Sequence, residues 1–126
     1  MSKTVPSTPS APNAMGPYSF VTEAGGLVFL SGQVALDPVT GDRRPDDVEI
    51  QARQVMDNIG AILDDLGLSY EDIAKTTIFL ADMGDYSKVN NVYGSYFGTE
   101  PPARSAIQAG ALPGGFLVEI EVVAAR

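Results

Sequence analysis

The sequence predicts one α+β domain in which two helices pack on one face of a mixed sheet. Segments with strand and helix patterns follow one another in the order β-β-α-β-α-β-β. Each helical segment has one apolar face, which suits packing against a sheet. The other face of the sheet would stay uncovered, and this favours a closed cyclic oligomer that buries it.

The N-terminal residues 1–13 are rich in Ser, Thr and Pro. They predict a flexible lead-in, because they bury too little apolar surface to offset the entropy of ordering them. The single domain is expected to occupy residues 14–126. The lead-in lacks the apolar segment of a secretory signal, and no apolar run approaches the ~20 residues that span a bilayer. We therefore expect a cytoplasmic protein that does not bind membranes.

The first elements are two short strands. Residues 16–21 read as a turn and a strand, and a glycine pair, Gly25-Gly26, separates them from a second strand at residues 27–31. Two apolar runs joined by glycines predict a hairpin. We interpret Gly32-Gln33 and residues 37–42 as chain-breaking signals, which predicts a loop after the hairpin.

A long helix is predicted from Asp46 to Leu66. Its apolar positions recur at helical spacing: Val48, Ala52, Val55, Met56, Ile59, Ile62, Leu63 and Leu66. Asp46 or Asp47 is a suitable N-cap, and Gly67 is a suitable residue just past the C-terminus.

A strand at residues 73–80 and a second helix follow. The strand is β-branched and apolar, and its Lys75 fits a solvated position better than a catalytic amine. The second helix is expected to begin at Asp82 or Asp85 and to end near Gly98. Its predicted apolar face consists of Tyr86, Val89, Val92, Tyr93, Tyr96 and Phe97.

The last two strands lie within residues 101–126, joined by a Gly/Pro-rich connection. Because prolines cannot donate ladder hydrogen bonds, pairing should begin at about Arg104. In the final strand the residues alternate between two faces. One face carries Val118, Ile120, Val122 and Ala124, and the other carries Leu117, Glu119, Glu121 and Val123.

Composition restricts the available chemistry. The chain has no cysteine and no histidine, which excludes disulfides, thiol nucleophiles, imidazole bases and the commonest metal ligands, so no metal site is expected. The net charge of −8 disfavours nucleic acid and anionic membranes as partners. The one adjacent basic pair, Arg43-Arg44, lies among aspartates and is interpreted as a solvated turn.

Arg104 and Glu119 are the candidate catalytic residues. A guanidinium matches a carboxylate bidentately, and a nearby carboxylate can orient or deprotonate a water. Together they suit hydrolysis of a small carboxylate-bearing substrate. The alternative is structural, because an arginine at a strand start often forms a surface ion pair and alternating glutamates often mark a solvated face.

Several sequence blocks resemble the Rid family (reactive intermediate deaminases, also called YjgF) from about Ala11 to Ala124. The blocks are Gly16-Pro17-Tyr18-Ser19, Ser31-Gly32-Gln33, Asp37-Pro38-Val39-Thr40-Gly41, Gln51 with Asn58, Lys75-Thr76-Thr77-Ile78-Phe79-Leu80, Val89-Asn90 with Tyr93 and Phe97, Pro102-Ala103-Arg104-Ser105, Leu112-Pro113 and Val118-Glu119-Ile120-Glu121. Their order and spacing make the match specific.

This resemblance implies a chorismate-mutase-like α+β fold assembled as a homotrimer, with a cleft at each subunit interface. It also implies hydrolysis of enamines and imines, such as 2-aminoacrylate and its imine tautomer, to 2-keto acids and ammonia. No cofactor is implied for this reaction.

The resemblance assigns roles to particular residues. Arg104 matches the arginine that holds the substrate carboxylate, and Glu119 matches the glutamate that positions the attacking water. Substrate-binding positions match Tyr18, Ser31, Gly32, Asn90 and Ala106. Many members have cysteine at position 106, and we expect its backbone carbonyl, which alanine retains, to be the functional group. A neighbouring arginine is expected to lower the pKa of Glu119.

Structural roles remain open for three of these residues. Tyr18 suits a buried aromatic, Ser31 a turn at a strand end, and Asn90 a helix residue bonded to a loop.

Other functions also remain open. The same cleft would suit a module that binds a small carboxylate without converting it, or a deaminase for an aminomuconate-like compound. A ribonuclease is disfavoured by the acidic charge and the lack of histidine.

Overall fold

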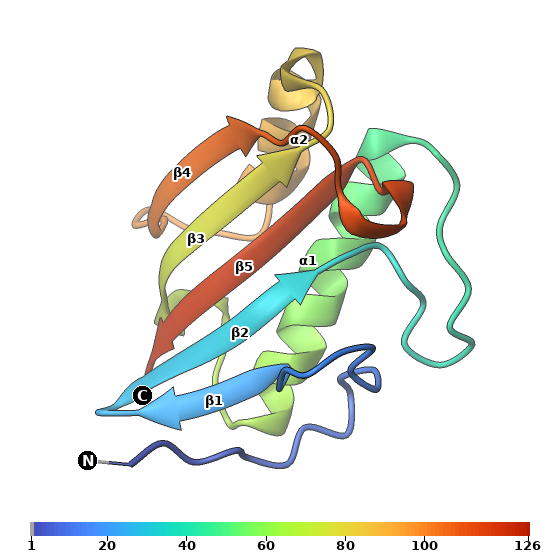
Figure 1. The fold of residues 1–126 in the computed structure, drawn as a ribbon. Coiled ribbons are helices and arrows are strands. Elements are labelled where there is room, and N and C mark those ends of the chain that lie inside the picture. The colour runs from blue at the N-terminus through green and yellow to red at the C-terminus, as the bar shows by residue number, and fades with distance from the viewer. Residues whose placement is uncertain (1) are drawn as a thin grey trace.

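The computed structural model describes residues 2–126 as a five-stranded mixed sheet with two helices on one face. In chain order the elements are β1 (Val21–Ala24), β2 (Leu27–Gln33), α1 (Val48–Asp65), β3 (Ile73–Leu80), α2 (Tyr86–Gly94), β4 (Ala103–Gln108) and β5 (Val118–Ala125). The strand order is β1-β2-β5-β3-β4, and only β3 and β4 are parallel. Both helices lie behind the sheet in Figure 1. The predicted α+β class and element order are confirmed.

The second strand continues two residues further than predicted. Gly32 and Gln33 belong to β2, so their interpretation as the start of a loop was wrong. Leu30 pairs with Val122 and Gln33 pairs with Ile120, so β2 carries one extra residue and forms a β-bulge. The bulge resets the alternation of side chains, and Leu30 and Gln33 therefore both lie buried.

The long helix forms as predicted. The side chain of Asp47 accepts hydrogen bonds from the backbone N–H groups of Glu49 and Ile50, at 3.0 and 3.1 Å, and caps the start of α1. Gly67 adopts a φ of 72° just beyond the end of α1. This left-handed conformation is the one for which glycine has no steric cost.

Two buried amides of α1 hold the loops around it. Gln51 donates to the carbonyl of Pro45 at 3.1 Å and accepts from the N–H of Leu117 at 2.9 Å. Asn58 donates to the carbonyl of Leu36 at 2.8 Å. These bonds fix the connection after β2 and the segment that enters β5, and both segments border the candidate site.

The second helix is shorter than predicted, because α2 ends at Gly94 and not near Gly98. Beyond it the backbone N–H groups of residues 95–97 bond to carbonyls three residues back, so the chain tightens into turns. Tyr96 and Phe97 pack on Tyr70 from these turns. The aromatic pattern continues past the helix because it serves this packing.

The N-terminal segment lies along the domain (Figure 1). Thr4 pairs with Glu23 of β1, and Ser10 bonds to the carboxylate of Asp65 at the end of α1, at 2.7 and 2.9 Å. The flexibility of residues 1–13 in solution and the boundary at residue 14 stay predictions.

The sheet face opposite the helices is uncovered in the single chain. Large apolar side chains remain exposed there, with Leu27, Phe29 and Ile107 at 39, 40 and 48%. Among residues 2–126, no helix is long and apolar enough to cross a membrane.

Candidate functional site

Arg104 lies at the start of the edge strand β4 and points toward α2. It is paired with Thr76 of β3, which in turn pairs with Val122 of β5. Thr76 and Val122 are buried on the helix side of the sheet. Since paired positions share a face, the Arg104 side chain belongs to the helix side as well.

Neutral groups of α2 hold the Arg104 guanidinium. Its Nη1 donates to Asn90 Oδ1 at 2.7 Å, and its Nη2 donates to the Tyr86 hydroxyl at 2.8 Å. Its Cζ lies 5.4 and 5.2 Å from the ring centroids of Tyr86 and Tyr93. Among residues 2–126 no carboxylate lies within salt-bridge distance of Arg104. The guanidinium is therefore fixed in position while its positive charge is not neutralised, as an anion-binding site requires.

Tyr93, the second tyrosine near the Arg104 guanidinium, is held by a buried hydrogen bond. The hydroxyls of Tyr93 and Thr76 are hydrogen-bonded at 2.8 Å in the buried interior. Burial raises the pKa of Tyr93, against the opposing effects of the Thr76 hydrogen bond and the Arg104 charge. Tyr93 therefore presents a neutral ring to the guanidinium.

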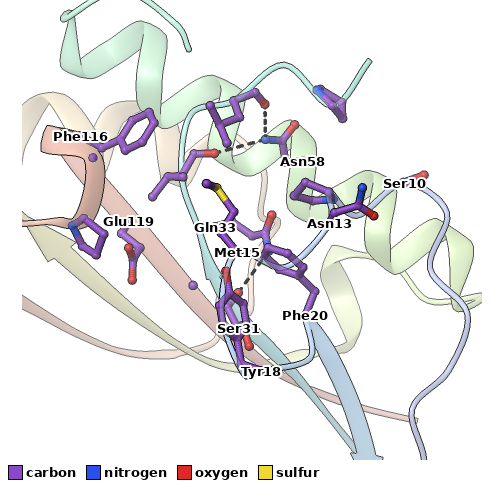
Figure 2. A pocket seen from close by; sticks show the side chains of 17 residues that line it. Ser10, Asn13, Met15, Tyr18, Phe20, Ser31, Gln33, Asn58, Phe116 and Glu119 are labelled. Carbon is purple, nitrogen blue, oxygen red and sulfur yellow. Dashed lines mark hydrogen bonds between the residues drawn. The ribbon is translucent and has the colours of Figure 1, made fainter. Parts of the chain in front are cut away.

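Glu119 lies in a different place, a groove of about 590 Å³ lined by residues of β2 and β5, the N-terminal segment and Asn58 of α1 (Figure 2). Tyr18, Ser31 and Gly32 also line this groove. Burial, and secondarily the charge of Glu121, raises the pKa of Glu119. The expectation that an arginine lowers this pKa was wrong for the single chain, because within residues 2–126 no arginine is among the groups that shift it.

The sheet register separates the two candidate catalytic residues. Glu119 pairs with Phe79, and Phe79 pairs with Ile107 of β4. This row is three residues along β3 from the row of Arg104, so its side chains point to the opposite face. Two strand spacings and three residue rises place the two backbone positions about 14 Å apart. One chain does not bring Arg104 and Glu119 together.

The remaining predicted residues divide between these two places. Asn90 and Ala106 accompany Arg104, since Ala106 is two residues along β4 and packs against the core. Ser31 belongs to the groove, but its hydroxyl donates to the carbonyl of Ser19 at 2.7 Å. Ser31 thus closes the turn before β1 as well as lining the groove, and Tyr18 is 47% exposed.

Sequence reasoning missed Tyr86 as a partner of Arg104. It was assigned to the apolar face of the helix, but its side chain is 40% exposed and bonded to the guanidinium. Tyr86 lies four residues before Asn90, which places both on one helical face. That spacing could have indicated from the sequence that Tyr86 and Asn90 contact the same group.

Arg43 is exposed, as predicted for a solvated turn, but it also makes a specific contact that the sequence did not indicate. Its guanidinium donates to the carbonyl of Gly114 and lies 4.2 Å from the centroid of the Phe116 ring. Phe116 lines the groove. Arg43 therefore links the loop after β2 to Gly114 and Phe116, which line the groove.

Neither place resembles a metal site. Among residues 2–126 no three Asp or Glu side chains form a group that could hold a metal ion. The groups available are a guanidinium, a carboxylate, hydroxyls and amides.

Comparison with known proteins identifies the family. The family model described as "Endoribonuclease L-PSP" matches residues 8–126. A Rid family protein from Yersinia pestis is 46% identical, with a TM-score of 0.94 over 99% of this chain and all of that one. The chain belongs to the Rid family. A mouse relative named 2-iminobutanoate/2-iminopropanoate deaminase is 44% identical over 95% of this chain and 89% of its own.

Another similar structure is that of Escherichia coli TdcF with bound serine. It is 40% identical, with a TM-score of 0.89 over 98% of each chain. The resemblance predicted from the sequence blocks is thus confirmed. Two residues of those blocks, Gln51 and Asn58, are the amides of α1 that hold the neighbouring loops, and Asn58 also lines the groove of Glu119 (Figure 2).

Gly32 of the Rid chain is predicted to control the position of Glu119. A Cβ added at Gly32 would lie 2.3 Å from Glu119 Oε2. Gly32→Ala should displace the carboxylate toward solvent and bring the pKa of Glu119 down toward its ordinary value. Because the displaced atoms end a flexible side chain, the free energy of unfolding should fall by less than about 1 kcal/mol. Carboxyl titration by NMR measures the pKa.

Gly94→Ala is the matched control, since a Cβ there meets nothing within 4 Å. It should leave the pKa of Glu119 unchanged. An unaltered pKa in Gly32→Ala would contradict the close approach of backbone and carboxylate.

Proposed function

We propose that this Rid protein hydrolyses enamine and imine intermediates of the 2-aminoacrylate type to 2-keto acids and ammonia. The observation that carries the proposal is the Arg104 guanidinium, held by Asn90 and Tyr86 without an acidic partner among residues 2–126. The proposal is supported by the relatives named 2-iminobutanoate/2-iminopropanoate deaminase. It is also supported by TdcF, whose bound serine carries the α-carboxylate that such a guanidinium recognises.

We further propose that the working form is a homotrimer of chorismate-mutase-like subunits, each a single domain over residues 14–126. Each site would combine Arg104 of one chain with Glu119 of a neighbour. The opposite faces of these residues in one chain support this arrangement, as do the exposed apolar side chains of the open sheet face. Closed rings bury such faces.

In the proposed mechanism Arg104 fixes the substrate carboxylate by two charge-assisted hydrogen bonds. The enamine tautomerises to the imine by moving a proton from nitrogen to carbon. A water positioned by Glu119 adds to the electrophilic imine carbon, its proton passing through the carboxylate to nitrogen. The tetrahedral adduct then collapses to the keto acid and releases ammonia.

The other predicted residues would shape this site. Asn90 orients the guanidinium, and the carbonyl of Ala106 would face the substrate from the edge strand β4. Tyr18, Ser31 and Gly32 would surround the water beside Glu119. The site needs no metal or cofactor for this chemistry, because the imine carbon is already electrophilic.

Other functions make different predictions. A carboxylate-binding module is favoured by the serine bound to TdcF, and it would bind serine but release no ammonia from freshly generated 2-aminoacrylate. A deaminase of an aminomuconate-like compound would prefer that substrate in the same assay. The description of the family model as an endoribonuclease predicts RNA cleavage, which the net charge of −8 disfavours.

The shared site can be tested by mixing two inactive variants. Arg104→Ala and Glu119→Gln chains, co-expressed with different tags and purified as mixed assemblies, should regain activity that neither variant has alone. In a mixed trimer of either composition about one interface in three has both native residues. Ammonia release by the mixed assembly measures the recovery. No recovery in verified mixed assemblies would exclude a site shared between chains.

A further inference from the structure

The position of Tyr86 carries an inference about how the substrate is held. Tyr86 is the first residue of α2, and its hydroxyl oxygen accepts a hydrogen bond from Arg104 Nη2 at 2.8 Å. Its side chain is 40% exposed, so the hydroxyl lies at the surface beside the cation. The sequence blocks that resemble the Rid family do not include this residue.

The hydroxyl proton of Tyr86 is unused in the single chain. Among residues 2–126 the Tyr86 hydroxyl makes only the hydrogen bond that it accepts from Arg104. The phenolic proton must point away from the N–H group that donates to the same oxygen. It is therefore available to an anion that binds beside the guanidinium.

The guanidinium retains donors for such an anion. Of its five N–H groups, one is used by Asn90 and one by Tyr86, which leaves three. A carboxylate has two oxygens with about four acceptor positions. Two guanidinium donors occupy some of these acceptor positions, and the Tyr86 hydroxyl beside the guanidinium can occupy another.

Accepting from a cation also makes the phenol a stronger donor. Hydrogen bonds in a chain polarise one another, so the Tyr86 O–H should bond more strongly to an anion than an isolated phenol would. We propose that Tyr86 is a substrate-binding residue whose hydroxyl donates a further hydrogen bond to the carboxylate seated on Arg104. This inference rests on the proposed function only in taking a carboxylate as the ligand.

Tyr86→Phe is the direct test, because it removes the hydroxyl and keeps the ring stacked near the guanidinium. The KM for freshly generated 2-aminoacrylate should rise about tenfold, the lower range for a hydrogen bond to a charged group, with kcat within about twofold. Tyr96→Phe is the control: it removes a hydroxyl bonded to Asp57, away from Arg104, and should leave KM unchanged.

A binding experiment separates this inference from the proposed reaction. Affinities for serine and serinamide, measured by NMR titration, differ through the carboxylate alone. Tyr86→Phe should reduce the preference for serine over serinamide about tenfold, while Tyr96→Phe should preserve it. If the native chain releases no ammonia but shows this loss, the proposed reaction fails and the inference stands.

Two results would overturn the inference. One is an unchanged preference for serine in a folded Tyr86→Phe chain. The other is a native chain that binds serine no better than serinamide. A structural role for the hydroxyl would lower stability in Tyr86→Phe without altering that preference.

Discussion

Arg104→Ala is expected to reduce kcat/KM for imine hydrolysis by roughly a hundredfold or more. The substitution removes the only positive charge in the cluster formed with Asn90, Tyr86 and Tyr93. The side chain makes no ion pair among residues 2–126, so the fold should survive its loss. Release of ammonia and keto acid from freshly generated 2-aminoacrylate measures the effect, and circular dichroism checks the fold.

Arg104→Lys is the matched variant. It keeps the positive charge but loses the planar fork that reaches Asn90 and Tyr86 together. We expect it to recover only a small part of the activity. Turnover close to the native rate in a folded Arg104→Ala protein would refute the assignment of Arg104 to the substrate carboxylate.

Glu119→Gln is expected to lower kcat by about a hundredfold to ten-thousandfold, the range for loss of a general base. Glutamine keeps the size of the side chain and can still orient water, but it cannot take a proton. Burial and Glu121 raise the pKa of Glu119 in the single chain, whereas the neighbour's Arg104 in the proposed site opposes this shift. In either case native activity should decline on the acid side as Glu119 takes up a proton. Rates measured across pH should lose this decline in Glu119→Gln.

The same shift predicts the stability of the variant. With a raised pKa, the folded state keeps a proton that the unfolded chain has already released, so stability falls as the pH rises through the folded pKa. Glu119→Gln removes this loss and should be more stable than the native chain at neutral pH. Denaturant unfolding at neutral and acid pH tests the sign, and lower stability at neutral pH would contradict it.

Local patterns predicted most of the fold. The helix from Asp46 to Leu66 could be predicted because its apolar periodicity, its cap at Asp47 and its terminating Gly67 agree. The end of β2 could not, because a bulge at Ser31 and Gly32 breaks the period of two on which strand prediction depends. The order of the strands also has no local signature, since β5 enters between β2 and β3.

The site was predicted by residue type and resemblance, but its geometry was not. Alternation along β5 placed Glu119 on the face opposite Val118, as the structure confirms. Whether Arg104 shares that face depends on its register through β3, which one sequence does not fix. The role of Tyr86 was hidden because tyrosine suits an apolar helix face as well as a hydrogen bond to arginine.

The placement of Arg104 and Glu119 on opposite sides of one sheet has a consequence for a newly synthesised chain. A single chain carries both reactive side chains but cannot bring them to the same substrate molecule. If neighbouring chains complete each other's sites as proposed, the rate per chain depends on the protein concentration. Dilution that separates the chains would then abolish activity.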